Sequence, residues 1–330
     1  MIVGFDVGGT NARALLLDPE TGHIVDRERQ SSRCPGPELR DRLATMVREL
    51  ARRNHTAVTA VGLGVAGLAH RSGVVYYSPN LPELVEYPLG SELEAELGIP
   101  VAVLNDATAG TWAEARLGAG RGSDHFAFVA LGTGIGTGFV CDGTLLQGAH
   151  GFAGESGHIV VDANGPPHIT GQRGPWEYFA SGSALGRMGR EAAQANAFEA
   201  GKKLVDSVDE ITGFHVVQAL RDGDTQAAAI LDEFCRNVAL GVANLVMIFD
   251  CDRVVIGGGL TEIGEPLRSG IERWLPQLLL GSAHRPPVEV VLAELGDDAG
   301  ALGAALFSRH LEAGATIDTI ALDSPVAHVA

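Results

Sequence analysis

The start of the chain alternates between short apolar runs and turn-forming residues. Apolar runs at 2–5 and 12–17 flank a glycine-rich turn, and after the turn at 18–22 a third run continues to about residue 30. Short runs bounded by Gly, Asn and Asp are typical of antiparallel strands joined by hairpins. The pattern therefore predicts a three-stranded antiparallel meander.

A helical period follows over residues 36–53. Apolar side chains recur there at steps of three and four, with Arg and Glu between them: Leu39, Leu43, Met46, Val47 and Leu50. That spacing predicts an amphipathic helix. Strands are predicted near 58–65 and 100–104 with short helical segments between them, where Ser91 and Glu94 have the spacing of a capping box.

The opening pattern returns in the second half of the chain. A strand at 126–131, a Gly-Thr turn at 132–136, a strand at 137–141 and a further strand to about 147 repeat the first unit. The repeat predicts two similar α/β domains that face each other, each with a glycine-rich turn reaching into the cleft. The later pattern predicts helices over about 183–221, 225–249, 262–280 and 298–310, and strands ending at Gly257–Gly259 and at 288–293.

Composition and charge narrow the class of protein. The 330 residues are 45% hydrophobic, and 24 Lys and Arg against 41 Asp and Glu give a formal net charge of −17. These values are typical of one or two soluble globular domains and not of a disordered chain. An acidic surface repels nucleic-acid phosphates and anionic lipid, so we expect a small-molecule partner and neither nucleic acid nor a membrane.

Cysteine usage and the N-terminus indicate a reducing compartment. The cysteines are scattered without a C-x-x-C pair, at positions 34, 141, 235 and 251. This argues against a disulfide framework and against a cysteine-based zinc site. The N-terminus lacks the basic segment and apolar core of a signal peptide, and no run of about 18 apolar residues could span a bilayer. A cytoplasmic protein is expected.

The two glycine-rich turns are candidates for phosphate binding. Gly8, Gly9 and Thr10 follow the first strand, and the turn at 132–136 follows the strand of the second unit. Glycine leaves backbone N–H groups accessible to an anion. Asp6, just before the first turn, is placed to meet a hydrated Mg²⁺ between the phosphates. For each turn alone the alternative is a tight hairpin, with Asp6 as an Asx-turn residue; the repetition favours phosphate binding.

Other nucleotide motifs fit less well. A Rossmann turn needs G-x-G-x-x-G between a strand and a helix, whereas residues 132–138 carry glycine at every second position and lead into another strand. The Gly-Lys-Ser/Thr tripeptide of a Walker A loop does not occur in the chain. A nicotinamide-dependent dehydrogenase is therefore disfavoured.

Two further pairs of polar residues have spacings that suit catalysis or binding. Asn105 and Asp106 follow an apolar strand and precede a predicted helix, where a carboxylate can act as general base for a hydroxyl. The alternative is that Asp106 is only the N-cap of that helix. Glu155 and His158 lie in a glycine-flanked loop where both can reach one ligand. Loop solvation and a hydrogen-bonded histidine are the alternatives for this second pair.

These motifs, taken in order, resemble the ROK family (repressors, open reading frames and sugar kinases) of the actin-like, hexokinase fold. The resemblance covers nearly the whole chain through the motifs at 5–11, 104–106, 131–136, 154–158, 176–182, 257–259 and 295–305. It implies an α/β fold with two similar actin-like (ribonuclease H-like) domains flanking a nucleotide and sugar cleft. We expect a small domain over 1–107, completed by about 303–330, and a large domain over 108–302.

The resemblance implies ATP-dependent phosphorylation of a hexose, with Mg²⁺ as cofactor and glucose as the first expectation. Asp106 matches the family's base, and the sugar-binding positions are Asn105, Asp106, Glu155, His158 and Glu177. The nucleotide-binding positions are Asp6, Gly8, Gly9, Thr10, Asn11, Gly132, Thr133, Gly134, Gly257, Gly258 and Gly259, with Asp6 near the metal. Asn80 is a further sugar-side candidate, with a plain turn residue as the alternative.

Several alternatives stay open within this resemblance. The acceptor can be fructose, mannose, allose, N-acetylglucosamine or N-acetylmannosamine, and the protein can be a non-catalytic sugar sensor. The chain begins at its first strand, so no helix-turn-helix is expected ahead of it and DNA binding is not expected. The resemblance also implies a homodimer or tetramer.

One loop departs from the family pattern. The family commonly holds zinc with a His matching His158 and three cysteines, whereas the cysteine positions here are His168, Thr170 and Pro175. Thr and Pro cannot replace thiolates, and two histidines fall short of a closed tetrahedral site. We therefore expect no structural zinc, and zinc is not an expected cofactor.

Overall fold

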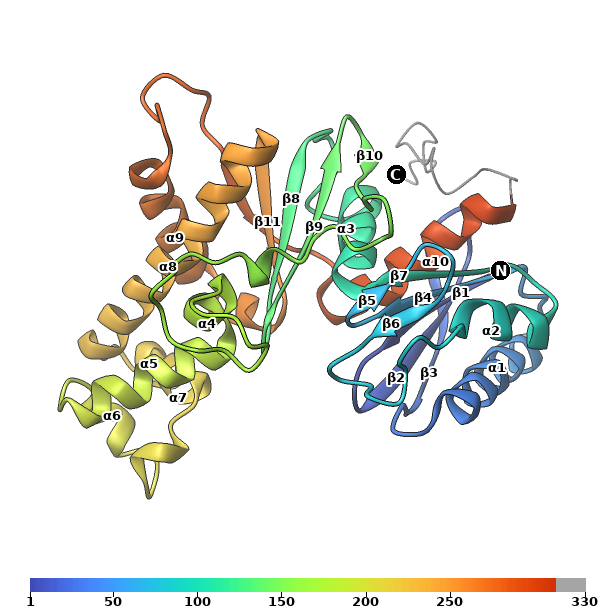
Figure 1. Cartoon of the computed structure of the whole chain (residues 1–330), viewed down its shortest axis with the longest axis horizontal. Helices are drawn as coiled ribbons and strands as arrows, with labels where there is room; N and C mark the ends of the chain where they lie inside the picture. Colours follow the sequence, from blue (N-terminus) through green and yellow to red (C-terminus); the bar gives the residue numbers. More distant parts are fainter. Residues whose placement is uncertain (313–330) are drawn as a thin grey trace. The chain divides into compact units, whose positions relative to one another are not determined.

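The computed structural model describes residues 1–312 and shows a mixed α/β protein (Figure 1). Most of the range 303–330, which is expected to complete the small domain, falls in residues 313–330, outside the described part of the chain. Within residues 1–312, no helix has the length and apolar character needed to cross a membrane.

The chain divides into two compact units. Among the described residues, unit 1 comprises 1–128, 138–154 and 294–312, and unit 2 comprises 129–137 and 155–293. The helix that starts at Asp106 belongs to unit 1, whereas the domain limits expected from the sequence assign it to the larger domain. Those expected domain limits stay a prediction.

Unit 1 contains a five-stranded sheet with the order β3-β2-β1-β4-β7. The strands are β1 (Ile2–Val7), β2 (Asn11–Leu17), β3 (Ile24–Ser31), β4 (Ala60–Val65) and β7 (Val101–Asn105). Strand β2 is antiparallel to both β1 and β3, which confirms the meander, and β4 is parallel to β1 and to β7. A small separate sheet pairs β5 (Leu68–Ala69) with β6 (Val75–Tyr77).

Helices cover both faces of this sheet (Figure 1). Val3, Phe5 and Val7 share one core with the apolar residues of α1 (Gly36–Arg53) and α2 (Leu89–Leu97). The alternate residues of the strands share the other core with residues of α3 (Asp106–Leu117) and α10 (Ala299–Glu312), which follows the short η4 (Gly296–Asp298). Successive residues of these strands thus face opposite cores, and α1 confirms the predicted helix over 36–53.

Two glycines let helix α10 lie directly on the sheet. A Cβ at Gly4 would overlap the carbonyl oxygen of Ala301, and a Cβ at Gly62 would overlap that of Ala304. Both glycines lie on adjacent strands in register with each other. The close approach requires residues without side chains at these positions.

The second five-stranded sheet has the order β10-β9-β8-β11-β12. Its strands are β8 (Phe126–Leu131), β9 (Ile135–Cys141), β10 (Thr144–Leu145), β11 (Arg253–Gly257) and β12 (Glu289–Leu292). If the strands of each sheet are numbered in chain order, both sheets have the same spatial order: third, second, first, fourth, fifth. This shared order is the repeat that was read from the sequence. The limit between the units falls within β8 and β9.

Unit 2 is otherwise helical. Its elements are η1 (Ser156–His158), α4 (Trp176–Ala180), α5 (Gly182–Gln194), α6 (Glu199–Lys202), η2 (Val208–Glu210), α7 (Gly213–Arg221), α8 (Thr225–Phe249), η3 (Gly259–Ile263) and α9 (Glu265–Leu278). The long helix α8 packs against α4, α5, α7 and α9. Its bounds match the predicted helix over 225–249, and α9 and α10 likewise occupy the predicted helical ranges.

Two details of the predicted helices are wrong. The stretch 183–221 is broken, because Asn196 has a left-handed backbone and Ser207 and Thr212 cap new turns. Ser91 and Glu94 form no capping box, since both lie inside α2, whose N-cap is Pro88 without a side-chain hydrogen bond. Glu94 instead accepts a hydrogen bond from the Val101 N–H at 3.2 Å.

Candidate active site

The first glycine turn follows β1 and is held by hydrogen bonds from the end of β3. The Gly8 N–H donates to the Asn11 carbonyl at 3.1 Å, and the buried Ser32 donates its hydroxyl to the Gly8 carbonyl. The Ser32 N–H donates to the Thr10 carbonyl at 3.1 Å. Among residues 1–312, no acceptor takes a hydrogen bond from the N–H of Gly9 or Thr10. The turn therefore offers two backbone donors to an anion.

An arginine that the sequence analysis missed lies at this turn. Arg33 donates a hydrogen bond from Nη2 to the Thr10 hydroxyl at 3.3 Å. The contact arises because β2 and β3 pair with Asn11 opposite Ser31, which brings the residues after β3 beside the turn. Only the strand register reveals this cation, since Arg33 is more than twenty residues from the turn in sequence.

Gly9 also lies against Asn80. A Cβ at Gly9 would come within 2.7 Å of the Asn80 carbonyl and 2.9 Å of its Cβ. Asn80 is exposed, and its side chain forms no hydrogen bond with another residue of the described range 1–312. The structure thus brings the sugar-side candidate Asn80 next to the phosphate-side turn, within unit 1.

Asp6 is an ionisable group with a strongly changed pKa. Burial is the main cause, and the Asp106 carboxylate adds to it, so the pKa of Asp6 rises from its ordinary value of 3.8 to about 6. Arg13 opposes this rise, while Asp297, which pairs with Arg13 at 3.1 Å, adds to it. A carboxyl group in these surroundings gains from a cation that offsets its charge.

Asp106 and its neighbour have different structural roles. Asn105 is the N-cap of α3: its Oδ1 accepts hydrogen bonds from the N–H of Ala107 at 2.9 Å and of Thr108 at 3.1 Å. Its Nδ2 donates to the Gly67 carbonyl at 3.1 Å. The alternative in which Asp106 is the N-cap is therefore wrong, because Asp106 is the first residue of the helix.

The surroundings of Asp106 suit a proton acceptor. Burial raises the pKa of Asp106, while the hydrogen bond that its Oδ1 accepts from the Ala107 N–H at 2.9 Å lowers it. A carboxylate with a raised pKa is a stronger base than an exposed one. Val7, Val65 and Asn105 are aligned across β1, β4 and β7, so Asp6 and Asp106 lie near the same edge of the sheet.

The second glycine turn is fixed by helix α5. The Gly182 N–H donates to the Gly132 carbonyl at 2.7 Å, and the Ser183 hydroxyl donates to the Thr133 carbonyl at 2.8 Å. The N–H groups of Thr133 and Gly134 have no acceptor in the described part of the chain. The two turns thus share the same property, which is a pair of backbone donors without protein partners.

The glycines at 257–259 lie beside this turn. Gly258 has a φ of +81°, and a Cβ there would lie 2.5 Å from the carbonyl oxygen of Leu131, the last residue of β8. A Cβ at Gly259 would have no atom within 4 Å, and this glycine is exposed. Gly258 is therefore required for the approach of two chain segments, while Gly259 leaves open space.

The remaining sugar-side candidates form one cluster in unit 2. The Oε2 atom of Glu177, in the first turn of α4, accepts a hydrogen bond from the Ile135 N–H at 2.8 Å. His158 ends η1, and its Nε2 lies 3.9 Å from Glu155 Oε2. The loop that contains Glu155 and His158 lies against the start of β9, since a Cβ at Gly157 would be 2.6 Å from the Ile135 carbonyl.

Glu177 is positioned by its neighbour Trp176. The indole is 1% exposed, donates from Nε1 to the Asn237 carbonyl at 3.0 Å, and fills the space over Gly241 of α8. A side chain at position 241 would overlap the ring. The start of α4, and with it the Glu177 carboxylate, is thereby anchored to α8.

A third ionisable group, Glu177, lies near His158 and His168, the two histidines of the loop in which no zinc site is expected. His158, His168 and Glu177 each offer one ligand atom, and these atoms lie within 4.8 Å of one another. Glu177 was expected at the sugar and not beside the two histidines. Thr170 donates or accepts at His168 Nδ1 at 2.9 Å, and Pro175 is the N-cap residue of α4. A closed four-ligand site is still not formed by these side chains.

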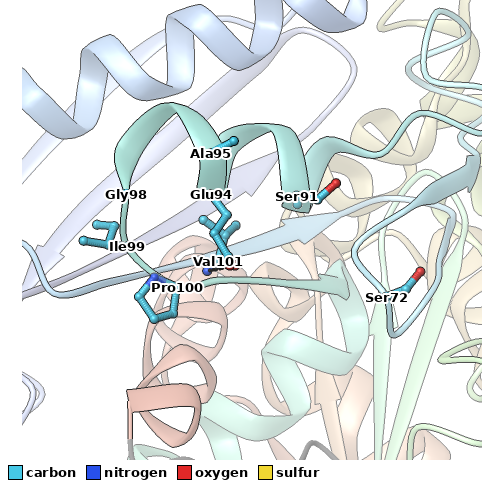
Figure 2. A pocket seen from close by; sticks show the side chains of 9 residues that line it. Ser72, Ser91, Glu94, Ala95, Gly98, Ile99, Pro100 and Val101 are labelled. Carbon is cyan, nitrogen blue, oxygen red and sulfur yellow. Dashed lines mark hydrogen bonds between the residues drawn. The ribbon is translucent and has the colours of Figure 1, made fainter.

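A surface pocket of unit 1 contains none of these residues. It has a volume of about 670 Å³ and is lined by Ser72, Gly90, Ser91, Glu94, Ala95, Gly98, Ile99, Pro100 and Val101. Figure 2 shows that its lining comes from α2, the segment into β7 and the turn at Ser72. The lining contains one carboxylate, that of Glu94, and it already accepts a hydrogen bond from a backbone N–H. A single carboxylate does not supply paired groups for catalysis, so the candidate site lies elsewhere.

The structure gathers the candidates in two sets. In unit 1 it brings together Asp6, the turn with Gly8, Gly9, Thr10 and Asn11, and the pair Asn105 and Asp106. In unit 2 it brings together the turn with Gly132, Thr133 and Gly134, the glycines 257–259, and the cluster with Glu155, His158 and Glu177. The roles of these residues stay predictions.

Comparisons with known proteins point to one family. A family model described as "ROK family" matches residues 2–310. A relative from Streptomyces coelicolor described as "Glucokinase" is 36% identical over 94% of this chain and 98% of its own. A relative from Citrobacter koseri described as "N-acetylmannosamine kinase" is 32% identical over 93% of this chain and 98% of its own.

A solved structure is similar at the level of the fold and of the sequence. It is the ROK family glucokinase from Streptomyces griseus in complex with glucose and AMPPNP. Its TM-score is 0.81 at 35% sequence identity, and the match covers 94% of this chain and 99% of that one.

Proposed function

The chain belongs to the ROK family, and from that premise we propose that it is a sugar kinase that transfers the γ-phosphoryl group of ATP to a hexose hydroxyl. Glucose is the acceptor that we expect, with glucose 6-phosphate as the product. The observation that carries this proposal is the likeness, over nearly the full length, to proteins described as glucokinases, one of them holding glucose and an ATP analogue. The equivalent strand order of the two sheets supports two similar actin-like, ribonuclease H-like domains.

Asp106 is the proposed general base. Its carboxylate stands at the N-terminus of α3, and burial raises its pKa, so it can accept the proton of the sugar hydroxyl as the new P–O bond forms. The N-terminus of the helix stabilises the ionised form before the proton arrives. Asn105 caps the helix and fixes the direction in which Asp106 points.

The two glycine turns are the proposed phosphate-binding elements. Each has two backbone N–H groups without a protein acceptor in the described part of the chain, and such groups bind phosphate oxygens. Arg33, beside Thr10, adds a positive charge to the first turn. The glycines 257–259 are proposed to lie near the adenosine, with open space at Gly259.

Mg²⁺ is the proposed metal cofactor, and the donor set of unit 1 fits it. Asp6 would hold the ion through water, because its carboxylate is partly buried, is next to another acidic group and lies beside the first turn. When bound, Mg²⁺ supplies positive charge that offsets the negative charge of the phosphates. The cation would also keep Asp6 ionised at a pH near its raised pKa.

The sugar hydroxyls are proposed to contact Asn105, Asp106, Glu155, His158 and Glu177. Carboxylates accept and the amide both donates and accepts, which suits the fixed directions of hydroxyls on a pyranose ring. In Asn105 both amide atoms are already engaged in the structure, although Nδ2 has a second hydrogen that can be donated. The oligomeric state and cytoplasmic location expected from the sequence stay predictions.

The test is ADP release by the purified protein with MgATP over a panel of sugars. We expect turnover with glucose, and phosphorus NMR of the product should show the phosphate on the 6-hydroxyl. The panel includes fructose, mannose, allose, N-acetylglucosamine and N-acetylmannosamine. A higher kcat/KM for another sugar would replace glucose as the acceptor while keeping the kinase.

The relative described as an N-acetylmannosamine kinase supports keeping amino sugars in that panel. A non-catalytic sugar sensor is distinguished by a second measurement on the same samples. Sugar-dependent thermal stabilisation without ADP release, for every sugar of the panel, would contradict the kinase proposal and favour the sensor.

A further inference from the structure

Glu114 is a fully buried acidic residue outside the two sets of candidate residues. It lies on α3, about two helical turns after Asp106, and is 0% exposed. Burial of a carboxylate costs free energy unless hydrogen bonds offset that cost. Here three backbone N–H groups supply these hydrogen bonds, and they come from two segments that are far apart in the chain.

The hydrogen bonds of Glu114 join the end of α3 to the segment before α10. Its Oε2 accepts a hydrogen bond from the Ala119 N–H at 2.7 Å. Its Oε1 accepts from the N–H groups of Glu294 at 3.1 Å and Leu295 at 3.0 Å. Gly118 leaves room for this carboxylate, since a Cβ at position 118 would overlap Oε2. All of these residues belong to unit 1.

The segment that Glu114 holds continues into η4, which reaches the surroundings of Asp6. Asp297 of η4 pairs with Nη1 of Arg13 at 3.1 Å. Arg13 stands directly opposite Asp6 in the register of β1 and β2. Gly300 also lies near Asp6, since a Cβ at position 300 would be 3.6 Å from the Asp6 Cγ. The position of this segment therefore decides which charged groups surround Asp6.

We propose that Glu114 is a positioning residue for the cation that Asp6 is proposed to meet. By holding the segment before η4, Glu114 keeps Asp297 paired with the Arg13 guanidinium. Arg13 is then not free to pair with the Asp6 carboxylate, which stays available to Mg²⁺. This inference rests on the proposed function, since it concerns the cation site of Asp6, and it adds a residue outside the motifs of the sequence.

Arg13 would otherwise compete with the cation. Residues directly opposite each other on antiparallel strands have Cβ atoms about 4.5–5.5 Å apart on the same face, so the Arg13 guanidinium can reach Asp6. Burial is the main cause that raises the pKa of Asp6, and among the weaker influences Arg13 lowers it while Asp297 raises it. If Asp297 moved away, we expect Arg13 to turn to Asp6 and to occupy the oxygens that a hydrated Mg²⁺ would use.

The competing explanation is that Glu114 contributes only to the stability of the fold. The body of α10 is held without it, because a Cβ at Gly303 would overlap the Ala109 carbonyl of α3, and the sheet meets the helix closely at Gly4 and Gly62. The Glu114 carboxylate instead holds the chain just before η4. A purely structural role predicts lower stability with unchanged cation binding, whereas a positioning role predicts a changed cation affinity.

The first test is the affinity for Mn²⁺, which takes the same oxygen ligands as Mg²⁺ and is followed by electron paramagnetic resonance. The full-length protein is first saturated with a non-hydrolysable ATP analogue. Asp297→Asn, at an exposed side chain, should raise the Kd for Mn²⁺ by about tenfold, as expected for a residue that acts on a metal site through its neighbours. Asp298→Asn is the matched control, because Asp298 pairs with Arg27 at 2.6 Å, and it should leave the Kd unchanged. Equal Kd values for the two variants would overturn the proposal.

The second test asks whether Glu114 acts through Asp297. Glu114→Gln should raise the same Kd, because an amide cannot accept hydrogen bonds at both of its ends, whereas Glu294→Gln, at an exposed side chain of the same segment, should not. The double variant Glu114→Gln/Asp297→Asn should bind Mn²⁺ as Asp297→Asn does, since two changes that act through one contact are not additive. Additive effects on the Kd, or an unchanged Kd in Glu114→Gln, would contradict the role of Glu114.

Turnover separates this inference from the proposed function. With MgATP, the Mg²⁺ concentration for half-maximal rate should rise in Glu114→Gln and in Asp297→Asn, while KM for the sugar stays the same. No turnover by the unsubstituted protein over the sugar panel would contradict the kinase. Turnover together with equal Mn²⁺ affinities in all variants would overturn only the role of Glu114. If Glu114→Gln does not fold, the comparison of Asp297→Asn with Asp298→Asn decides.

Discussion

Asp6 and Asp106 form an acidic pair near one edge of the sheet in unit 1: burial first, and then the Asp106 carboxylate, raises the pKa of Asp6 to about 6. The pair exists because β1 and β7 are both parallel to β4 and end together. If this edge of the sheet served only the stability of the fold, we would not expect two carboxyl groups to lie here. The proposed function explains the free-energy cost of keeping these two carboxyl groups close together, because Asp106 is the proposed base and Asp6 is proposed to meet a cation.

The raised pKa of Asp6 predicts a pH-dependent gain of stability in Asp6→Asn. The folded-state pKa of about 6 lies above the ordinary value of 3.8, so the folded protein binds this proton more tightly than the unfolded chain. Ionisation between about pH 4 and 6 therefore destabilises the native state, by about 1–3 kcal/mol for a shift of this size. Asp6→Asn should raise the free energy of unfolding by that amount at pH 7.5 and leave it nearly unchanged at pH 4.

Urea unfolding at the two pH values, without Mg²⁺, measures this difference. Asp209→Asn is the matched control, since Asp209 is exposed in η2 and its replacement should have no effect at either pH. A loss of stability in Asp6→Asn at neutral pH, or the same change at both pH values, would contradict the assigned cause. The variant is also expected to lose Mg²⁺-dependent turnover.

Asp106→Asn tests the proposed base. An amide cannot accept the proton of the sugar hydroxyl, so kcat should fall by about two to four orders of magnitude. Sugar binding, measured by calorimetry, should survive, since an amide keeps hydrogen bonds to a hydroxyl. Near-normal turnover would remove Asp106 from the mechanism, and Asp209→Asn again serves as the control for a surface substitution.

Local patterns in the sequence were sufficient for much of the fold. The step of three and four over 36–53 and the short apolar runs at 2–17 predicted α1 and the meander, because one buried face per element fixes the period. The choice between Asn105 and Asp106 as N-cap was beyond the sequence, since both residue types cap helices well. In the structure Asn105 is the N-cap, and its amide also donates a hydrogen bond to the Gly67 carbonyl. This contact joins segments that are far apart in the sequence.

Long-range contacts explain what the sequence did not indicate at the candidate site. Arg33 meets Thr10 only through the register of β2 and β3. Glu177 meets Ile135 only because Trp176 docks on α8. The family resemblance marked Glu177 as a functional position, but its approach to His168 depends on the fold of an irregular loop, which no periodicity predicts.

Asn105 should act on catalysis through the helix that it caps. Asn105→Ala removes both hydrogen bonds to the first turn of α3 and the bond to Gly67, and should cost about 1–2 kcal/mol of stability. Because Asp106 is the next residue, kcat should fall as well. Asn105→Asp keeps the capping acceptor and should recover most of the stability lost in the alanine variant. Equal unfolding free energies for the two variants, from urea titrations, would show that the cap is not the reason for the loss.

The contact between Trp176 and Gly241 predicts that a single methyl group disturbs sugar binding. Gly241→Ala would force the indole from its position on α8, and overpacking of this kind costs about 1–3 kcal/mol. Since Glu177 follows Trp176, KM for the sugar should rise; KM for ATP should rise less, because Glu177 also accepts the Ile135 N–H at the second glycine turn. Ala229→Ser, at an exposed position of the same helix, adds one atom without such a contact and should leave both unchanged. Steady-state kinetics with each substrate varied gives the answer, and parallel rises of both KM values would argue against a local effect at Glu177.

Arg33 should influence the nucleotide and not the sugar. Its guanidinium lies at the first glycine turn, where the Gly9 and Thr10 N–H groups have no acceptor among the described residues. A hydrogen bond to a charged group contributes about 1.5–3 kcal/mol, and the exposure of Thr10 places the effect at the lower end, so Arg33→Gln should raise KM for ATP by about tenfold. Arg29→Gln removes an equal charge from an exposed position on β3 and is the matched control. The effect of Arg33→Gln should diminish with added salt, because screening weakens an exposed charge; an equal effect in both variants would mean that net charge, and not the position of Arg33 at the turn, governs ATP binding.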